Sequence, residues 1–427
     1  MLDIIKTIIS DFHKWELPDT IVGRELLVPL NSRKVITIVG PRRAGKTYFL
    51  YSLIQNIEKK IGRKMIIYID FEDERLSLDS TQLHLILDGY QQLFPETDLK
   101  EVYYFFDEIQ EISGWEKFIR RLDSTITNNI FLTGSSSKFL SREIASALRG
   151  RTISYELFPF SFKEYLKYRK VNSEDVYSTR GKNKMITEFK HFLFRGGYPE
   201  VFDCEEELAV KILQSYVDIM LYRDIIERYR VSQVYVIKDM MRRLISNNAC
   251  MFSVHKYFND LHSRGIKIGK NTLYDFMDYF TEAYLTFQLN KYDYSIAKQE
   301  QALKKIYVND TGLGAACNFA VGWNKGRLLE TMIFLELKKA GLDVYYSNEN
   351  GECDFIAGEG RKIVSAIQVC YRLNEENQDR EIRGLLSALK KFKLSEGHVI
   401  TIDQEDKIET DGRKIFVHSA WKWLLQG

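Results

Sequence analysis

Apolar residues in the first 158 positions fall into short runs, separated by longer stretches in which they recur at helical spacing. The runs are rich in Val, Ile, Tyr and Phe, as buried strands are, and lie at 35–39, 65–69, 102–106 and 130–132. The stretches between them predict helices, for example over 48–60. Strands that alternate with helices predict a parallel sheet covered by helices, which is an α/β fold.

The pattern changes after residue 158. Helical periodicity dominates to about residue 250. Two short helices at 254–262 and 270–282, joined by a turn, predict a small winged helix over about 251–288. A helix followed by strand-like runs predicts a further small α/β unit beyond residue 300. We therefore expect three domains, at 1–157, 158–300 and 301–427.

The first apolar run leads into Gly40-Pro41-Arg42-Arg43-Ala44-Gly45-Lys46-Thr47, which fits the phosphate-binding loop (P-loop) pattern. A buried strand before the loop and a helix after it are the context that this motif requires. The N–H groups of the loop and of the helix start would point at a polyphosphate. Lys46 would contact the β- and γ-phosphates, and the Thr47 hydroxyl would bind Mg²⁺. ATP and Mg²⁺ are thus the predicted ligands.

Residues 102–106 form an apolar run closed by two carboxylates, Asp107 and Glu108, which is the shape of a Walker B strand. Asp107 would hold Mg²⁺ directly or through water. Glu108 projects differently and can polarise an attacking water as a general base. The alternative is an ordinary acidic turn after a buried strand, and the P-loop upstream favours the Walker B interpretation.

Hydroxyl and guanidinium groups follow the next predicted strand. The run at 130–132 ends in Thr133 and Ser135, either of which could hydrogen-bond the γ-phosphate. Arg149 and Arg151 flank a glycine, and arginines stabilise the charge of phosphoryl transfer, in the same chain or from a neighbouring subunit. A helix N-cap for the hydroxyl groups and solvated surface arginines are the alternatives.

Composition limits the partners and the compartment. The 427 residues include 61 Lys and Arg against 59 Asp and Glu, a net charge of +2, so nucleic-acid binding would need a local basic patch. The five cysteines are scattered and form no Cys-x-x-Cys pair, which predicts neither a disulfide framework nor a zinc site. No run approaches the ~20 apolar residues of a membrane span, and the first residues do not read as a signal peptide. We expect a cytoplasmic protein without a membrane partner.

Basic residues cluster in the predicted winged helix. Arg264, Lys267 and Lys270 lie at or just before the start of its second helix, where they would contact the phosphates of double-stranded DNA. Four aromatic residues on that helix favour a protein-packing role instead. Both interpretations stay open.

Four residues of the last unit fall at the positions of a metal-dependent nuclease site of the PD-(D/E)xK type. Glu330 on a predicted helix and Asp354 on a following strand match acids that gather Mg²⁺. Gln368 stands where a second acid belongs, and Cys370 where a lysine belongs. Gln lacks the charge and Cys cannot replace an ammonium group, so we expect a nuclease-like domain that is inactive.

Six segments together resemble a family of prokaryotic AAA-type ATPases with a C-terminal nuclease-like domain of unassigned function. They are residues 40–47, 106–110 with Trp115, 132–136, 159–164, 196–199 and 352–355. The resemblance implies a P-loop NTPase sheet, a helical and winged-helix middle, and a PD-(D/E)xK-like end.

The first functional hypothesis is a Mg²⁺-dependent ATP hydrolase whose nucleotide state moves the winged-helix and C-terminal parts. One alternative is a DNA-binding module that ATP regulates with negligible turnover. Another is a metal-dependent nuclease that uses Glu330 and Asp354. The near-neutral charge also leaves room for a protein partner or self-association.

Overall fold

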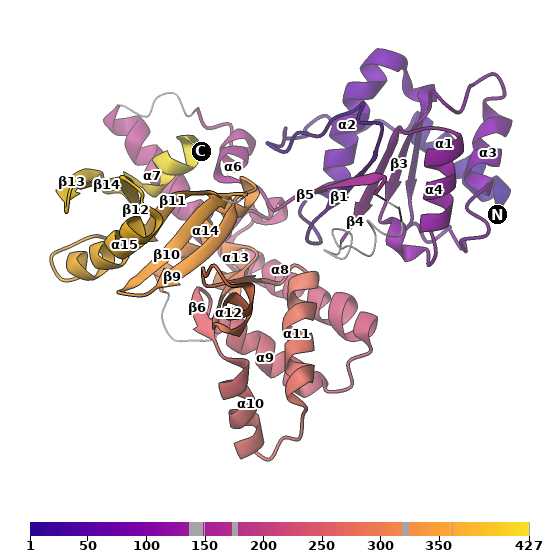
Figure 1. Cartoon of the computed structure of the whole chain (residues 1–427). Helices are drawn as coiled ribbons and strands as arrows, with labels where there is room; N and C mark the ends of the chain where they lie inside the picture. Colours follow the sequence, from indigo (N-terminus) through magenta and orange to yellow (C-terminus); the bar gives the residue numbers. More distant parts are fainter. Residues whose placement is uncertain (136–147, 149, 173–177, 318–323, 361, 427) are drawn as a thin grey trace. The chain divides into compact units, whose positions relative to one another are not determined.

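The computed structural model describes residues 1–135, 148, 150–172, 178–317, 324–360 and 362–426. The chain divides into two compact units, Met1–Phe158 and Pro159–Gly427, and each is described by itself (Figure 1). None of the helices in the described ranges has the length and hydropathy that a membrane span requires.

The first unit is a parallel sheet of five strands with helices on both faces. The order is β2-β3-β4-β1-β5, and all neighbours are parallel. The strands are β1 (Val35–Val39), β2 (Ile66–Asp70), β3 (Tyr103–Asp107), β4 (Ile130–Gly134) and β5 (Thr152–Glu156). Helix α2 (Lys46–Ile61) covers one face, and the other face is covered by α1 (Leu2–Lys14), α3 (Leu85–Leu93) and α4 (Glu116–Thr125) (Figure 1). The predicted α/β class and parallel sheet are confirmed.

Apolar side chains on both faces of the strands hold this sheet between its helices. All five residues of β1 are buried, as in parallel sheets that are covered on both sides. One core cluster joins the sheet to α1, α3 and α4, and a second joins it to α2. Because the strands are parallel, the carboxyl ends of β1, β3 and β4 meet at one edge, where α/β proteins place their ligands.

The second unit begins with a helical region. Its helices are α6 (Phe162–Tyr168), α7 (Thr179–Arg195), α8 (Glu206–Ile219) and α9 (Val234–Ser246). A π-helical segment, η5 (Met220–Glu227), continues α8. Short 3-10 turns are η1 (Arg63–Met65) and η2 (Ile109–Glu111) in the first unit and η4 (Pro199–Val201) in the second.

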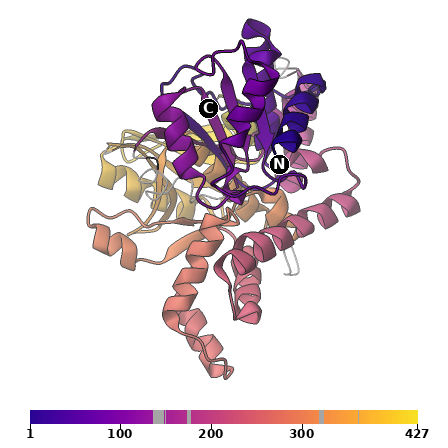
Figure 2. The ribbon, with the colours of Figure 1, turned by 90° about the vertical axis from the view of Figure 1, so that its right-hand side faces the viewer.

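A three-stranded antiparallel sheet follows, in the order β6-β8-β7. Its strands are β6 (Cys250–Phe252), β7 (Thr286–Leu289) and β8 (Lys304–Val308). The two short helices expected here are α10 (Val254–Ser263) and α11 (Lys270–Glu282), which lie side by side in Figure 1 and Figure 2. Strand β8 lies beyond residue 300, so this sheet extends into the range expected for the last domain.

The remaining sheet is mixed and has six strands in the order β13-β14-β12-β11-β10-β9. They are β9 (Asp343–Asn348), β10 (Glu352–Glu359), β11 (Lys362–Val369), β12 (Glu396–Thr401), β13 (Asp406–Thr410) and β14 (Arg413–Ser419). The helices of this region are α12 (Ile296–Gln301), α13 (Thr311–Ala316), α14 (Lys325–Lys339), α15 (Gln378–Phe392) and α16 (Ala420–Gln426). The predicted fold class is thus confirmed: a parallel sheet comes first, a helical region follows, and further sheet comes last.

Two of the segments that carried the family resemblance lock together in the second unit. The N–H of Phe160 donates to the carbonyl of Gly197 (2.8 Å), whose own N–H donates to buried Asp310 (2.7 Å). A Cβ on Gly197 would lie 2.4 Å from the Phe160 carbonyl oxygen, and one on Gly312 would lie 2.1 Å from that of Arg195. Only glycine fits either position, because backbone occupies the space of a side chain.

We predict that Gly197→Ala lowers the free energy of unfolding of the second unit by about 1–3 kcal/mol or more, because the new methyl group displaces backbone. Chemical unfolding followed by intrinsic fluorescence measures this loss. Gly269→Ala is the control, since its methyl group would meet nothing closer than 3.5 Å. Equal unfolding midpoints for the two variants would contradict the lock.

Candidate functional site

The P-loop connects the end of β1 to the start of α2. Gly45 has a φ of +93°, in the left-handed region that favours glycine. Gly40 is required for a different reason, because a Cβ there would lie 2.1 Å from the Leu157 carbonyl oxygen. The loop therefore curls tightly against the chain segment after β5.

An arginine that the sequence did not single out connects the P-loop to the chain segment after β5. The Arg24 guanidinium donates to the carbonyls of Ala44 (3.0 Å) and Phe158 (2.6 Å). Both partners are backbone carbonyls, and Phe158 is 134 residues away. No local pattern could have revealed this contact.

Lys46 is buried and turned back onto its own loop. Its side chain is 5% exposed, and its Nζ lies 3.2 Å from the carbonyl oxygens of both Gly40 and Pro41. The same Nζ lies 3.2 Å from Oε1 of Glu108. The predicted phosphate-binding cation and the predicted general base are therefore paired with each other.

Thr133 connects the two acids at the end of β3. Its hydroxyl donates to Oδ1 of Asp107 and accepts the N–H of Glu108 (2.8 Å). The Tyr68 hydroxyl donates to Oδ2 of Asp107 (3.0 Å), and Thr47 also hydrogen-bonds this carboxylate. Burial raises the pKa of Asp107 and the charge of Glu108 adds to this, against the opposing effects of Thr133, Thr47 and Lys46.

Glu108 responds in the opposite direction. Burial would raise its pKa, but the positive charge of Lys46 and a hydrogen bond from Gln110 outweigh burial and hold the pKa below its usual value. Its φ of +48° is left-handed, which costs a non-glycine residue about 1–2 kcal/mol. Such strain is typical of functional positions. Glu108 is thus an ionised carboxylate held inside the site.

Ser135 is linked to the acids through Gln110, the second residue that the sequence left without a role. The Gln110 amide donates to Oε2 of Glu108 and lies 3.4 Å from the Ser135 hydroxyl. Thr133 contacts both acids directly. The structure therefore gives Thr133 the closer position of the two hydroxyl candidates.

The structure does not bring Arg151 to this edge of the sheet. Its carbonyl accepts the N–H of Val35, at the amino ends of β1 and β5, and its guanidinium pairs with Asp123 (3.1 Å) and Ser124. Those strand ends are opposite to the P-loop. Arg149, the other predicted arginine, lies outside the described residues.

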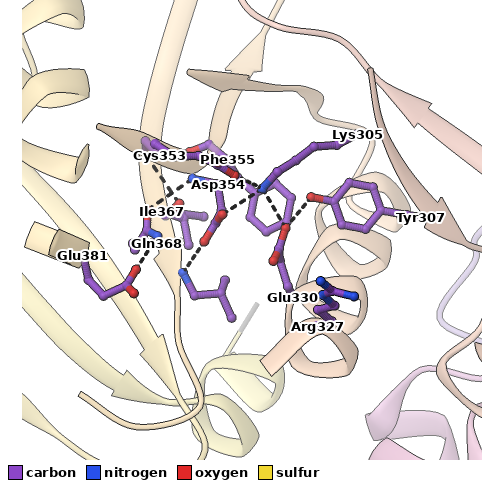
Figure 3. A network of polar contacts seen from close by, with 12 residues as sticks. Lys305, Tyr307, Arg327, Glu330, Cys353, Asp354, Phe355, Ile367, Gln368 and Glu381 are labelled. Carbon is purple, nitrogen blue, oxygen red and sulfur yellow. Dashed lines mark hydrogen bonds and ion pairs between the residues drawn. The ribbon is translucent and has the colours of Figure 1, made fainter. Parts of the chain in front are cut away.

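In the second unit, Glu330 and Asp354 do lie close together, around a lysine that the sequence did not indicate. The Nζ of Lys305 is 2.9 Å from each of the two carboxylates (Figure 3). Gln368 accepts the N–H of Asp354 (3.2 Å) and donates to Glu381 (2.7 Å).

Cys370 belongs instead to the apolar cluster under α15. Burial raises the pKa of its thiol to about 12. The position expected for a lysine is therefore part of the core.

Comparison with known proteins places the chain in a family. A model described as an AAA domain matches residues 32–166, and one described as Domain of unknown function (DUF8612) matches residues 186–324. The chain is 37% identical over 420 residues to the uncharacterized protein MJ1544 of Methanocaldococcus jannaschii, covering 95% of this chain and 91% of that protein. The chain belongs to the MJ1544 family. An uncharacterized protein of Haemophilus influenzae is 28% identical over 396 residues, which cover 91% of this chain and 94% of that protein.

Solved structures show weaker similarity. The Aeropyrum pernix ORC1 protein in complex with DNA aligns with a TM-score of 0.29 at 10% identity, covering 74% of this chain and 90% of that one. AMPPCP-bound DnaA from Aquifex aeolicus aligns with a TM-score of 0.24 at 14% identity, covering 65% and 85%. Neither similarity reaches the level at which function can be compared. The AAA-domain match, by contrast, includes the P-loop and the acids of β3, so this member of the MJ1544 family carries an AAA-type ATPase-like domain.

Asp70, at the end of β2, lies beside Asp107 in register. Burial, with the charge of Asp107 adding, raises its pKa to about 6 from 3.8. The folded state therefore holds the carboxyl proton of Asp70 more tightly than the unfolded state does. As a result, the free energy of unfolding falls as pH rises from about 4 to 6.

We predict that Asp70→Asn raises the thermal unfolding midpoint of the first unit at pH 7.5, and that the gain shrinks as pH falls through 6 and vanishes near 4. Asn keeps the oxygen that accepts the N–H of Glu72 (2.9 Å). Asp98→Asn is the matched control, an exposed carboxylate that also accepts an N–H two residues on. A gain that does not vary with pH would contradict the assignment.

Proposed function

We propose that the first unit binds and hydrolyses ATP with Mg²⁺. One observation carries this proposal: a buried lysine of the P-loop, the Walker B acids and a bridging threonine form one connected cluster at the carboxyl edge of the sheet. Lys46 would bind the β- and γ-phosphates, Glu108 would orient the attacking water and Thr133 would sense the γ-phosphate. These are the parts that phosphoryl transfer to water requires.

The donor set fits Mg²⁺. The carboxylate of Asp107 and the hydroxyl of Thr47 are already in hydrogen-bonding contact, and hard oxygen donors of this kind are the ligands that Mg²⁺ prefers. The buried carboxylate of Asp107 is costly to ionise, so a nearby cation would stabilise it. When bound, Mg²⁺ neutralises charge on the β- and γ-phosphates.

ATP binding would break the contact between Lys46 and Glu108, and this exchange would activate Glu108 for hydrolysis. In the structure, the ammonium of Lys46 contacts the carboxylate of Glu108 and two carbonyl oxygens of the loop. Phosphate oxygens carry more negative charge, and would draw Lys46 away from Glu108. Glu108 then loses its cation and becomes available to polarise water, and Thr133 and Gln110 still hold it in place.

The second unit is the part that the nucleotide state would act on. Within it, α9, β6, α10, α11 and β7 follow one another, and β8 comes after the short helix α12. This order is close to that of a winged helix, which supports that interpretation. Exposed Arg264, Lys267 and Lys270 at the turn before α11 make double-stranded DNA a second candidate ligand. The acids Asp239 and Asp260 lie 3.7 and 3.5 Å from Arg264 and partly neutralise the basic patch. A protein partner therefore fits this surface as well as DNA does. Cleavage of nucleic acid is not proposed, because Gln368 stands where a second acid belongs and both remaining acids, Glu330 and Asp354, are paired with Lys305.

We predict that Glu108→Gln lowers steady-state ATP turnover by about 100-fold or more while ATP binding persists, because Gln cannot act as a general base. Release of inorganic phosphate measures turnover, and equilibrium binding of ATP is measured in parallel. Glu101→Gln is the matched control, the same substitution at an exposed position just before the other end of β3. Normal turnover by Glu108→Gln would remove Glu108 from the mechanism.

The same assay with and without double-stranded DNA separates the candidate partners. Turnover that DNA accelerates supports a DNA-coupled ATPase. Turnover that DNA leaves unchanged points to a protein partner or to self-association. Bound ATP without any turnover points to the nucleotide-regulated binding module.

A further inference from the structure

The second polar cluster of the chain is built around a single ammonium group. Lys305 lies on β8, and its side chain is 3% exposed. Its Nζ lies 2.9 Å from Oε1 of Glu330 on α14 and 2.9 Å from Asp354 on β10 (Figure 3). The same Nζ lies 2.5 Å from Glu352, which is also on β10. Three carboxylates from two elements thus converge on one cation from a third.

Neighbouring groups hold two of these carboxylates in place. The Tyr307 hydroxyl donates to Oε1 of Glu330 (2.6 Å), the same oxygen that faces Lys305. Oδ2 of Asp354 accepts the N–H of Val369 (3.0 Å), which leaves Oδ1 for the ammonium. These two carboxylates are therefore held in position around the ammonium group.

The charges within the cluster do not cancel. One ammonium faces three carboxylates, of which Glu330 and Asp354 are buried and Glu352 is 42% exposed. Removal of the buried groups from water is costly unless opposite charge compensates it. Burial, with the charge of Asp354 adding, raises the pKa of Glu330 to about 8. Burial would lower the pKa of Lys305, but the surrounding negative charge outweighs it and keeps the amine protonated. The cluster has capacity for more positive charge than one lysine supplies.

We propose that Lys305 is the built-in cation of this site: its ammonium occupies the position between Glu330, Glu352 and Asp354 that a divalent metal ion would otherwise take. The chain thereby keeps the site free of metal and fastens β8 to α14 and β10. The proposal concerns the second unit alone and does not depend on ATP hydrolysis.

Removal of the ammonium should convert the cluster into a divalent-cation site. Carboxylate oxygens are the ligands that Mg²⁺ and Mn²⁺ prefer, and Lys305→Ala leaves three of them around an open space. Without a cation, their mutual repulsion should lower the unfolding midpoint of the second unit. Mn²⁺ should raise it again.

The experiment titrates Mn²⁺ into the nucleotide-free full chain, counts bound Mn²⁺ by electron paramagnetic resonance and records thermal unfolding. Lys305→Ala should bind about one Mn²⁺ more than wild type, recover its midpoint on adding Mn²⁺, and lose both effects when Asp354→Asn is added. In the otherwise wild-type chain, Asp354→Asn should not change the number of Mn²⁺ ions bound. Lys304→Ala, which removes the neighbouring lysine that contacts Asn290 (2.5 Å), is the matched control and should gain no Mn²⁺.

Two results would overturn the proposal. One is Mn²⁺ bound by wild type and lost in Asp354→Asn, since the lysine then does not exclude metal. The other is folded Lys305→Ala that gains no Mn²⁺. If Lys305→Ala is not folded as purified, its refolding in Mn²⁺ is compared with its refolding in EDTA. Folded protein from Mn²⁺ alone supports the proposal, and equal failure in both overturns it.

Discussion

A lysine ammonium that the fold has taken out of water forms the centre of the two polar clusters described above. Lys46 is 5% exposed and Lys305 is 3% exposed. A buried ammonium is stable only where carboxylates or carbonyl oxygens lie close to it. The arrangement of acids around each lysine follows from this requirement, and so do the different properties of the two clusters.

The partners of Lys46 can be exchanged, whereas those of Lys305 are fixed. Lys46 faces one carboxylate and two carbonyls of a loop whose N–H groups are suited to bind phosphate. A triphosphate can therefore replace Glu108 as its partner. Lys305 faces three carboxylates, two of which are anchored by Tyr307 and by the backbone of Val369. The first arrangement suits a site that changes state, and the second suits a permanent internal contact.

The order of the strands explains why the first cluster forms. Strand β4 lies between β1, which leads into the P-loop, and β3, which ends in Asp107. Its own end carries Thr133, which therefore reaches both acids of β3. The same geometry places Arg151 at the opposite edge, where it pairs with Asp123 of α4.

Most of the first unit could be predicted from the sequence because its signals are local. The P-loop is a contiguous motif, and the buried strands are short apolar runs, so their carboxyl ends identified Asp107, Glu108 and Thr133. Residues whose partners are distant left no such signal. Arg24 binds a carbonyl 134 residues away, and Lys305 binds Asp354 at a separation of 49. Analogy with nucleases directed attention to Cys370, which lies in an apolar cluster, while the cation of the site comes from another sheet.

The most direct test of this account is the dissociation constant of ATP, measured by calorimetry with Mg²⁺ for wild type, Lys46→Ala and Lys59→Ala. Lys59 is an exposed lysine on the same helix and serves as the control. The account predicts that wild type and Lys59→Ala bind alike, and that Lys46→Ala binds about 10- to 100-fold more weakly, through the loss of charge-assisted hydrogen bonds to phosphate. Equal affinity of all three proteins, or no binding by wild type, would contradict it.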